Sequence, residues 1–95
     1  MTLLQRVEAF SKNNPVAPNS SRTKEFALAG LASELGNLNK LCQNRQSSDA
    51  KDAFCHSTAM ILWYLANISR DMGLDFNTVG EAGFSKIVSL FEKRG

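Results

Sequence analysis

The sequence predicts an all-α fold made of one domain that spans residues 1–95. Apolar residues recur every three or four positions in four segments, and turn-forming residues separate these segments, which is the pattern of amphipathic helices. No segment alternates apolar and polar residues as a half-buried strand does. With 95 residues, of which 43% are hydrophobic, the chain is long enough for one compact domain and too short for a multidomain enzyme. We therefore expect a small four-helix bundle.

The first two helices are predicted from the turn signals between them. The first helix is expected to end near Lys12, because residues 13–20 contain two prolines and several turn-forming residues. Ser20 or Ser21 is a candidate N-cap for a second helix over residues 21–44. Its apolar stripe, about four turns long, consists of Leu28, Leu31, Leu35, Leu38 and Cys42.

The third helix is expected to be the longest and the most apolar. It follows the polar segment 43–48, which holds candidate capping residues, and it is expected to end at Gly73. Residues 59–66 are apolar without interruption, so two turns of this helix must be covered on every side. A membrane-spanning helix needs roughly 20 apolar residues, so this run is too short to cross a bilayer.

A fourth helix is expected to start after Asp75 and to run close to the C-terminus. It contains Gly80 and Gly83, each of which lowers helix stability by about 1 kcal/mol relative to alanine. We interpret these glycines as marks of close helix packing, because the segment lacks the strand and the lysine of a phosphate-binding loop.

The length of the chain predicts self-association. A domain of this size buries only about two thirds of its unfolded surface, and three companion helices can hardly cover residues 59–66 on all sides. We therefore expect a homodimer or homotetramer in which the third helices share a core. The alternative is a monomer in which the third helix is simply the central core helix.

The net charge and the cysteine content limit the cellular compartment and the classes of partner that we expect. The net charge of +2, with both signs interspersed, does not indicate nucleic acid or a membrane surface as a partner. Cys42 and Cys55 are too few for a disulfide framework, and the first ten residues lack the pattern of a signal peptide. The cytoplasm is therefore the expected compartment.

Three segments carry a resemblance to a known family. The segment 62–75 (LWYLANISRDMGLD), followed by 79–82 (VGEA), resembles the third and fourth helices of the MazG-like all-α nucleotide pyrophosphohydrolases, and 29–38 (AGLASELGNL) is similar to their second helix. The resemblance implies a MazG fold completed by dimer or tetramer packing. It also implies magnesium-dependent conversion of a nucleoside triphosphate to the monophosphate and pyrophosphate.

The sequence departs from this family at the metal-binding positions. In the family, helix two carries two glutamates three residues apart, and helix three carries a glutamate and an aspartate with the same spacing. Here Glu34 matches the first glutamate, but Asn37 stands at the second position, and Ser57 and Met60 stand at the other two. Magnesium prefers oxygen ligands, and a thioether such as that of Met60 is a soft ligand. With three of the four carboxylates replaced, we expect weak or absent turnover and assign no catalytic residue.

Two hypotheses for function follow from the resemblance. The first is an impaired pyrophosphohydrolase that binds a nucleoside triphosphate through Glu34, as the residual magnesium ligand, and through Lys40 and Lys86. The second is a non-catalytic oligomeric module that interacts with other chains and regulates, for example, an intact relative of the family. Asp49 and Asp52 are interpreted as complements of the helix dipole, because they precede Ser57 and Met60 by about 12 Å of helix.

Overall fold

The computed structural model describes residues 1–43 and 49–94, which fold into four α-helices without a strand. The helices are α1 (Leu3–Asn13), α2 (Thr23–Gln43), α3 (Ala50–Asp71) and α4 (Phe76–Arg94). The prediction of an all-α chain is confirmed, and α3, with 22 residues, is the longest of these helices, as expected. Within the described residues, no helix is long and apolar enough to cross a membrane.

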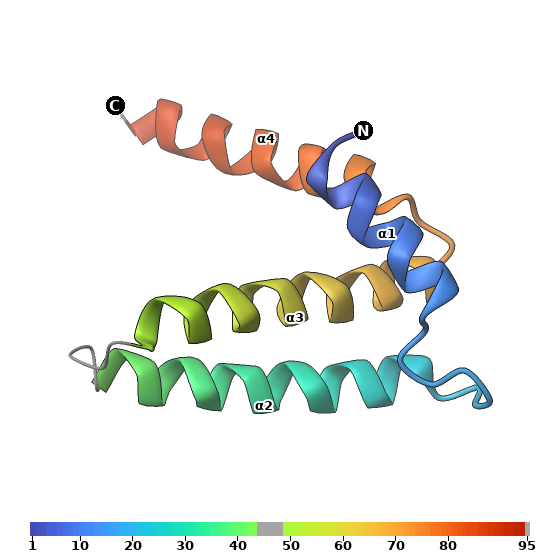
Figure 1. Cartoon of the computed structure of the whole chain (residues 1–95). Helices are drawn as coiled ribbons and strands as arrows, with labels where there is room; N and C mark the ends of the chain where they lie inside the picture. Colours follow the sequence, from blue (N-terminus) through green and yellow to red (C-terminus); the bar gives the residue numbers. More distant parts are fainter. Residues whose placement is uncertain (44–48, 95) are drawn as a thin grey trace.

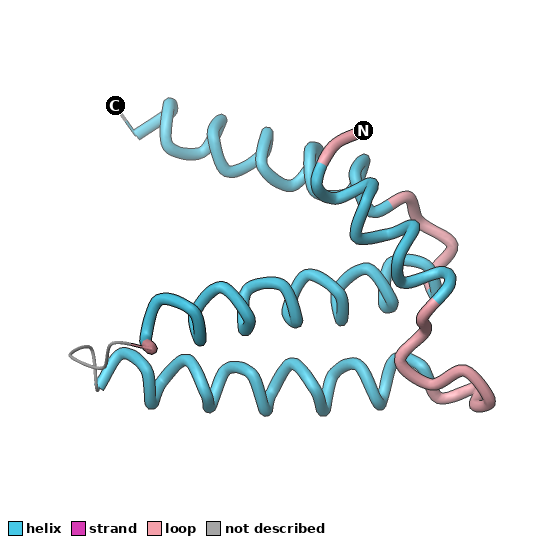
Figure 2. Tube along the Cα trace, in the orientation of Figure 1, coloured by secondary structure: helices cyan, strands magenta, loops and turns pink. Residues whose placement is uncertain are grey.

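The helices form an antiparallel pair with two further helices at one end. α2 and α3 lie side by side along their whole length, and α1 crosses the C-terminal half of α3 (Figure 1). α4 contacts α1 and the end of α3 but does not contact α2, and its C-terminal half diverges from the α2–α3 pair (Figure 1). The loops that set this arrangement join α1 to α2 and α3 to α4 (Figure 2).

The start of α2 differs from the prediction. The helix begins at Thr23 and not at residue 21, because its first helical hydrogen bond joins the Phe26 amide to the Arg22 carbonyl at 3.1 Å. Neither predicted serine is its N-cap; the Ser20 hydroxyl instead accepts a hydrogen bond from the Arg22 amide at 3.0 Å within the preceding loop. The capping candidates predicted for α3 at positions 44–48 lie outside the described residues.

The predicted end of α3 at Gly73 is confirmed by its backbone geometry. Gly73 has a φ angle of +73°, which side chains of L-residues rarely adopt. Its amide donates to the Arg70 carbonyl at 3.0 Å, and the Leu74 amide donates to the Ser69 carbonyl at 2.9 Å. This pair of hydrogen bonds is a Schellman motif, which satisfies the last carbonyl groups of the helix.

The start of α4 is fixed by two carboxylates. Asp75 is the cap: its Oδ2 accepts from the Thr78 hydroxyl at 2.8 Å and from the Thr78 amide at 2.9 Å. These hydrogen bonds stabilise the charged form and lower the pKa of Asp75 below its ordinary value of 3.8. Glu8 of α1 accepts a hydrogen bond from the Phe76 amide at 2.8 Å, so the first turn of α4 is held against α1.

The single chain buries few of its large apolar side chains. Among the described residues the buried apolar side chains are Ala27, Ala66 and Phe76. Within the apolar segment 59–66, Ala66 is buried, but Ala59 is exposed and Leu65 is 39% exposed. The third helix is therefore not enclosed on every side within one chain.

The surface area and the radius of gyration are both large for the mass. The accessible surface is 7124 Å², whereas a monomer of 10.4 kDa is expected to expose roughly 5,400 Å², which is an excess of about 1,700 Å². The radius of gyration is 15.3 Å, compared with about 12 Å for a compact chain of this length. Both differences reflect the divergence of α4 from the other helices.

Candidate functional site

Glu34 is the predicted site residue with the most unusual environment. It lies on α2, its side chain is 8% exposed, and its Oε1 has no hydrogen-bond partner among the described residues. A buried carboxylate oxygen without a hydrogen bond costs free energy. Glu34 is therefore a candidate binding group, and its burial is a property that the sequence did not indicate.

A cavity of about 400 Å³ lies toward the end of α2 and the start of α3, and four of the residues discussed in the sequence analysis line it. Asn37 and Lys40 come from α2, and Ser57 comes from α3. Asp49 also lines this cavity, at the start of α3. Glu34 is not among the lining residues, so the cavity brings together part of the predicted set and leaves out its only remaining carboxylate.

Two other predicted positions lie elsewhere. Met60 lines a different cavity, between α1 and α3, although it is only three residues from Ser57. Lys86 is exposed on α4, where it lies beside Ser89 and Lys93. Because α4 does not contact α2, a single chain does not bring Lys86 and Lys40 to one site.

The donor atoms around the cavity between α2 and α3 do not fit the magnesium centre that the resemblance implies. Asn37 and Ser57 offer neutral oxygens, and Asp49 precedes Ser57 by eight residues, or about 12 Å of helix. In the described part of the chain, no three His, Cys, Asp or Glu side chains gather into a group that could hold a metal ion. A hard divalent cation prefers several carboxylate or carbonyl oxygens, and one isolated carboxylate supplies little of that charge.

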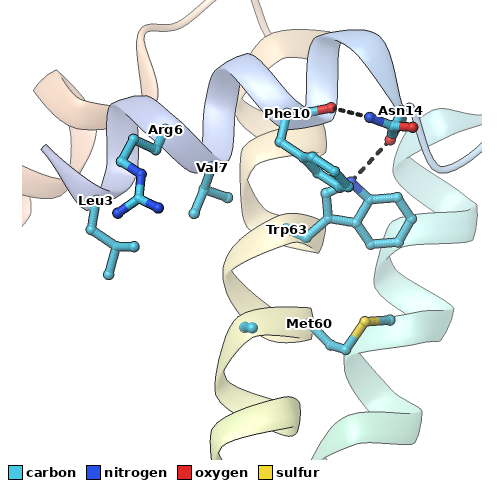
Figure 3. Close-up of a pocket in the computed structure, with 8 residues that line it drawn as sticks. Leu3, Arg6, Val7, Phe10, Asn14, Met60 and Trp63 are labelled. Carbon is cyan, nitrogen blue, oxygen red and sulfur yellow. Dashed lines mark hydrogen bonds between the residues drawn. The ribbon is translucent and has the colours of Figure 1, made fainter. Parts of the chain in front are cut away.

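A strongly apolar concave surface lies between α1 and α3. This α1–α3 groove has a volume of about 650 Å³, and its walls are almost entirely carbon. Figure 3 shows α1 side chains on one wall and α3 side chains on the other. The labelled residues that line it are Leu3, Arg6, Val7, Phe10, Asn14, Met60 and Trp63.

The polar atoms at one end of the groove already have partners. The indole Nε1 of Trp63 donates to the Asn14 carbonyl at 3.0 Å, and the Asn14 side-chain amide donates to the Phe10 carbonyl at 3.1 Å (Figure 3). Because these groups are satisfied within the chain, the groove presents a surface suited to an apolar occupant. The sequence analysis did not single out this groove.

The two adjacent aromatic residues of α3, Trp63 and Tyr64, take part in packing. The rings of Trp63 and Tyr64 lie with centroids 5.2 Å apart, and both side chains are half-buried. Tyr64 packs directly against Gly30 of α2, where its ring fills the space that a Cβ would occupy. These contacts favour the interpretation of both residues as packing groups over a role in stacking on a nucleobase.

A buried polar cluster joins α1, the following loop and α3. Asn67 and Ser11 are both fully buried. Arg70 donates to the Ser11 hydroxyl and to Asn67 Oδ1, and Asn67 Oδ1 also accepts from the Val16 amide at 3.1 Å. The sequence analysis missed this cluster; its signal was the two polar residues Asn67 and Arg70, which lie just after the apolar segment 59–66. The cluster joins α1 and the loop that follows it to α3.

Comparison of the chain with family models, curated proteins and solved structures finds no match.

Proposed function

We propose that this chain is a MazG-like helical protein that acts by assembling with another copy of itself and does not hydrolyse nucleotides. The observation that carries the proposal is the excess of about 1,700 Å² of accessible surface over a compact monomer of the same mass. Covering that excess on two chains corresponds to an interface of about 3,400 Å², within the range of obligate dimers. The exposed apolar side chains of α4 favour the same conclusion.

The absence of turnover follows from the chemistry of the donor atoms. Release of pyrophosphate by this family depends on magnesium ions that neutralise the triphosphate and activate water, and four carboxylates hold those ions. In this chain Glu34 is the only acidic residue at those four positions. The neutral Asn37 and Ser57 share a cavity that does not include Glu34. The proposed role is therefore that of an interaction module, with an intact relative of the family as a further candidate partner.

Residual nucleotide binding is the second candidate function. It is favoured by one observation, the buried Oε1 of Glu34, for which the described part of the chain supplies no hydrogen-bond partner. Lys40, one and a half turns farther along α2, lines the neighbouring cavity and could contact a phosphate group there. Lys86 could join this site only from a second copy of the chain, because α4 does not contact α2 in its own chain.

Calorimetry and an activity assay separate the two candidates. We expect no heat when magnesium and a nonhydrolysable nucleoside triphosphate are titrated into the protein, and no pyrophosphate release from any nucleoside triphosphate above a blank without protein. Glu34→Gln is the matched control, because it removes the charge and keeps the shape of the side chain. Heat that requires both magnesium and Glu34 would establish the second candidate, and magnesium-dependent release of pyrophosphate would overturn the first.

A further inference from the structure

The C-terminal half of α4 carries an apolar stripe whose side chains are largely exposed among the residues that the structure describes. The stripe consists of Gly83, Ile87 and Leu90, which lie on one side of the helix at spacings of three and four residues, and Phe84 borders it. Phe84 is 65% exposed, Ile87 51% and Leu90 63%. Side chains of this size cost free energy when they stay in water.

The same side of α4 is a helix-packing surface in its first half. Gly80 lies against α1, where an added Cβ would come within 2.6 Å of Leu4 Cδ1. At Gly83, less than one turn farther on, an added Cβ would meet nothing within 4 Å. The α4 stripe therefore continues an existing contact surface beyond the end of α1, and Gly83 leaves room for the close approach of another helix.

The α1–α3 groove is the complementary feature. Its volume of about 650 Å³ and its apolar walls suit a row of large side chains from an amphipathic helix. No residue of α4 lines this groove, so the stripe of a chain does not fill the groove of that chain. Each chain thus presents two apolar surfaces, the α4 stripe and the α1–α3 groove. The stripe does not occupy the groove of its own chain.

We infer that the α4 stripe of each chain occupies the α1–α3 groove of a second copy, so that two chains exchange these contacts about a two-fold axis. The inference rests on the proposed function and names the surfaces that form the assembly. A single groove-and-stripe contact would leave one groove and one stripe open, whereas the two-fold arrangement closes both. It also accounts for the excess accessible surface of about 1,700 Å² per chain. Each chain of an obligate dimer buries a surface of similar size at the interface.

A charge placed on the stripe tests this inference. Leu90→Glu is expected to weaken dimerisation at least 100-fold, roughly the effect of losing a well-buried interface residue, because the carboxylate would be taken into the apolar groove. Ser89→Glu is the matched control: it adds the same charge to the neighbouring exposed position, which lies off the stripe, and is expected to leave dimerisation unchanged. Both variants are expected to keep the helical content of the parent, because both positions are exposed in the single chain.

Cross-linking identifies the surface that the stripe contacts. Cys42 and Cys55 are exposed free thiols, so both are first replaced by serine, and the mass of this variant is checked against the wild type. Phe10→Cys, at the groove, and Leu90→Cys, on the stripe, are then made in separate chains. When the two are mixed and treated with a short bis-maleimide, we expect a product that contains one chain of each kind and little product from either variant alone.

The outcomes separate this inference from the proposed function. Products that join Leu90→Cys chains to each other would contradict groove occupancy and indicate pairing of α4 with α4. A dimer that survives Leu90→Glu and gives no mixed product would overturn the inference and leave the proposed assembly intact. A wild-type chain that is monomeric at all concentrations would overturn the proposed function and, with it, the inference.

Discussion

Replacement of Asn67 by alanine is expected to lower the free energy of unfolding by about 3 kcal/mol. Asn67 is fully buried, and its Oδ1 accepts hydrogen bonds from the Val16 amide at 3.1 Å and from Arg70 Nη2 at 3.0 Å. Its side-chain amide donates to the Trp63 carbonyl at 2.8 Å. Alanine would leave the Val16 amide and the Arg70 guanidinium without this acceptor, and a buried donor without a partner costs more than the bond itself contributed.

Asn67→Asp is the matched control for this prediction. Aspartate keeps an acceptor for Val16 and Arg70 and loses only the donor to Trp63, so a smaller loss than that of Asn67→Ala is expected. Urea unfolding followed by circular dichroism measures both, at one fixed protein concentration because association contributes to apparent stability. A loss below about 1 kcal/mol for Asn67→Ala would show that the cluster does not hold the loop to α3.

Gly30→Ala is expected to destabilise the protein by about 2 kcal/mol, although alanine is the better helix former. A Cβ at this position would coincide with the ring of Tyr64 and lie 2.7 Å from its hydroxyl oxygen. Tyr64 is half-buried in the contact between α2 and α3, so the ring must leave its site or the two helices must separate. Either response loses packing at the largest contact between helices in the chain.

The same substitution at Gly36 provides the control. Gly36 lies on the same helix, and an added Cβ there would meet nothing within 4 Å. Gly36→Ala should therefore raise the free energy of unfolding by about 1 kcal/mol, since only the helix propensity changes. Thermal unfolding of the two variants should give shifts of opposite sign. Equal shifts would mean that Tyr64 does not pack on Gly30 in solution.

Local signals in the sequence predicted the helices well. The end of α3 at Gly73 and the start of α4 after Asp75 depend on residues within one turn of each boundary, through a left-handed glycine and a side-chain cap. The start of α2 was placed two residues too early, because Ser20 and Ser21 are both good capping residues and the sequence does not fix which hydrogen bond forms first. Boundaries of this kind depend on the loop that leads into the helix.

The arrangement of the helices could not be predicted from the same signals. The sequence predicts a small four-helix bundle, and the all-α architecture is confirmed, but the sequence does not say how far α4 packs on the other helices. In the structure, Glu8 accepts a hydrogen bond from the Phe76 amide in the first turn of α4, and the C-terminal half of the helix diverges from the α2–α3 pair (Figure 1). Periodicity reports that a helix face is apolar, but it does not report which chain covers that face.

The candidate site was predicted only in part, for a geometric reason. The spacing of three residues predicts that Ser57 and Met60 share one face of α3, but the crossing of α1 over α3 directs Met60 into the α1–α3 groove while Ser57 lines the other cavity. Asn37 and Ser57 do line one cavity, because α2 and α3 run antiparallel at that level. The burial of Glu34 depends on how whole helices pack. The residues next to it in the sequence therefore do not predict it.

Sedimentation equilibrium of the wild-type chain tests the central claim, that the excess apolar surface is covered by a second copy. Two chains of 10.4 kDa have a mass of 20.8 kDa, and we expect that mass down to low micromolar concentration, as for an obligate dimer. A mass of 10.4 kDa at every concentration up to about 100 μM would contradict the account, because an interface of this size is expected to hold far more tightly.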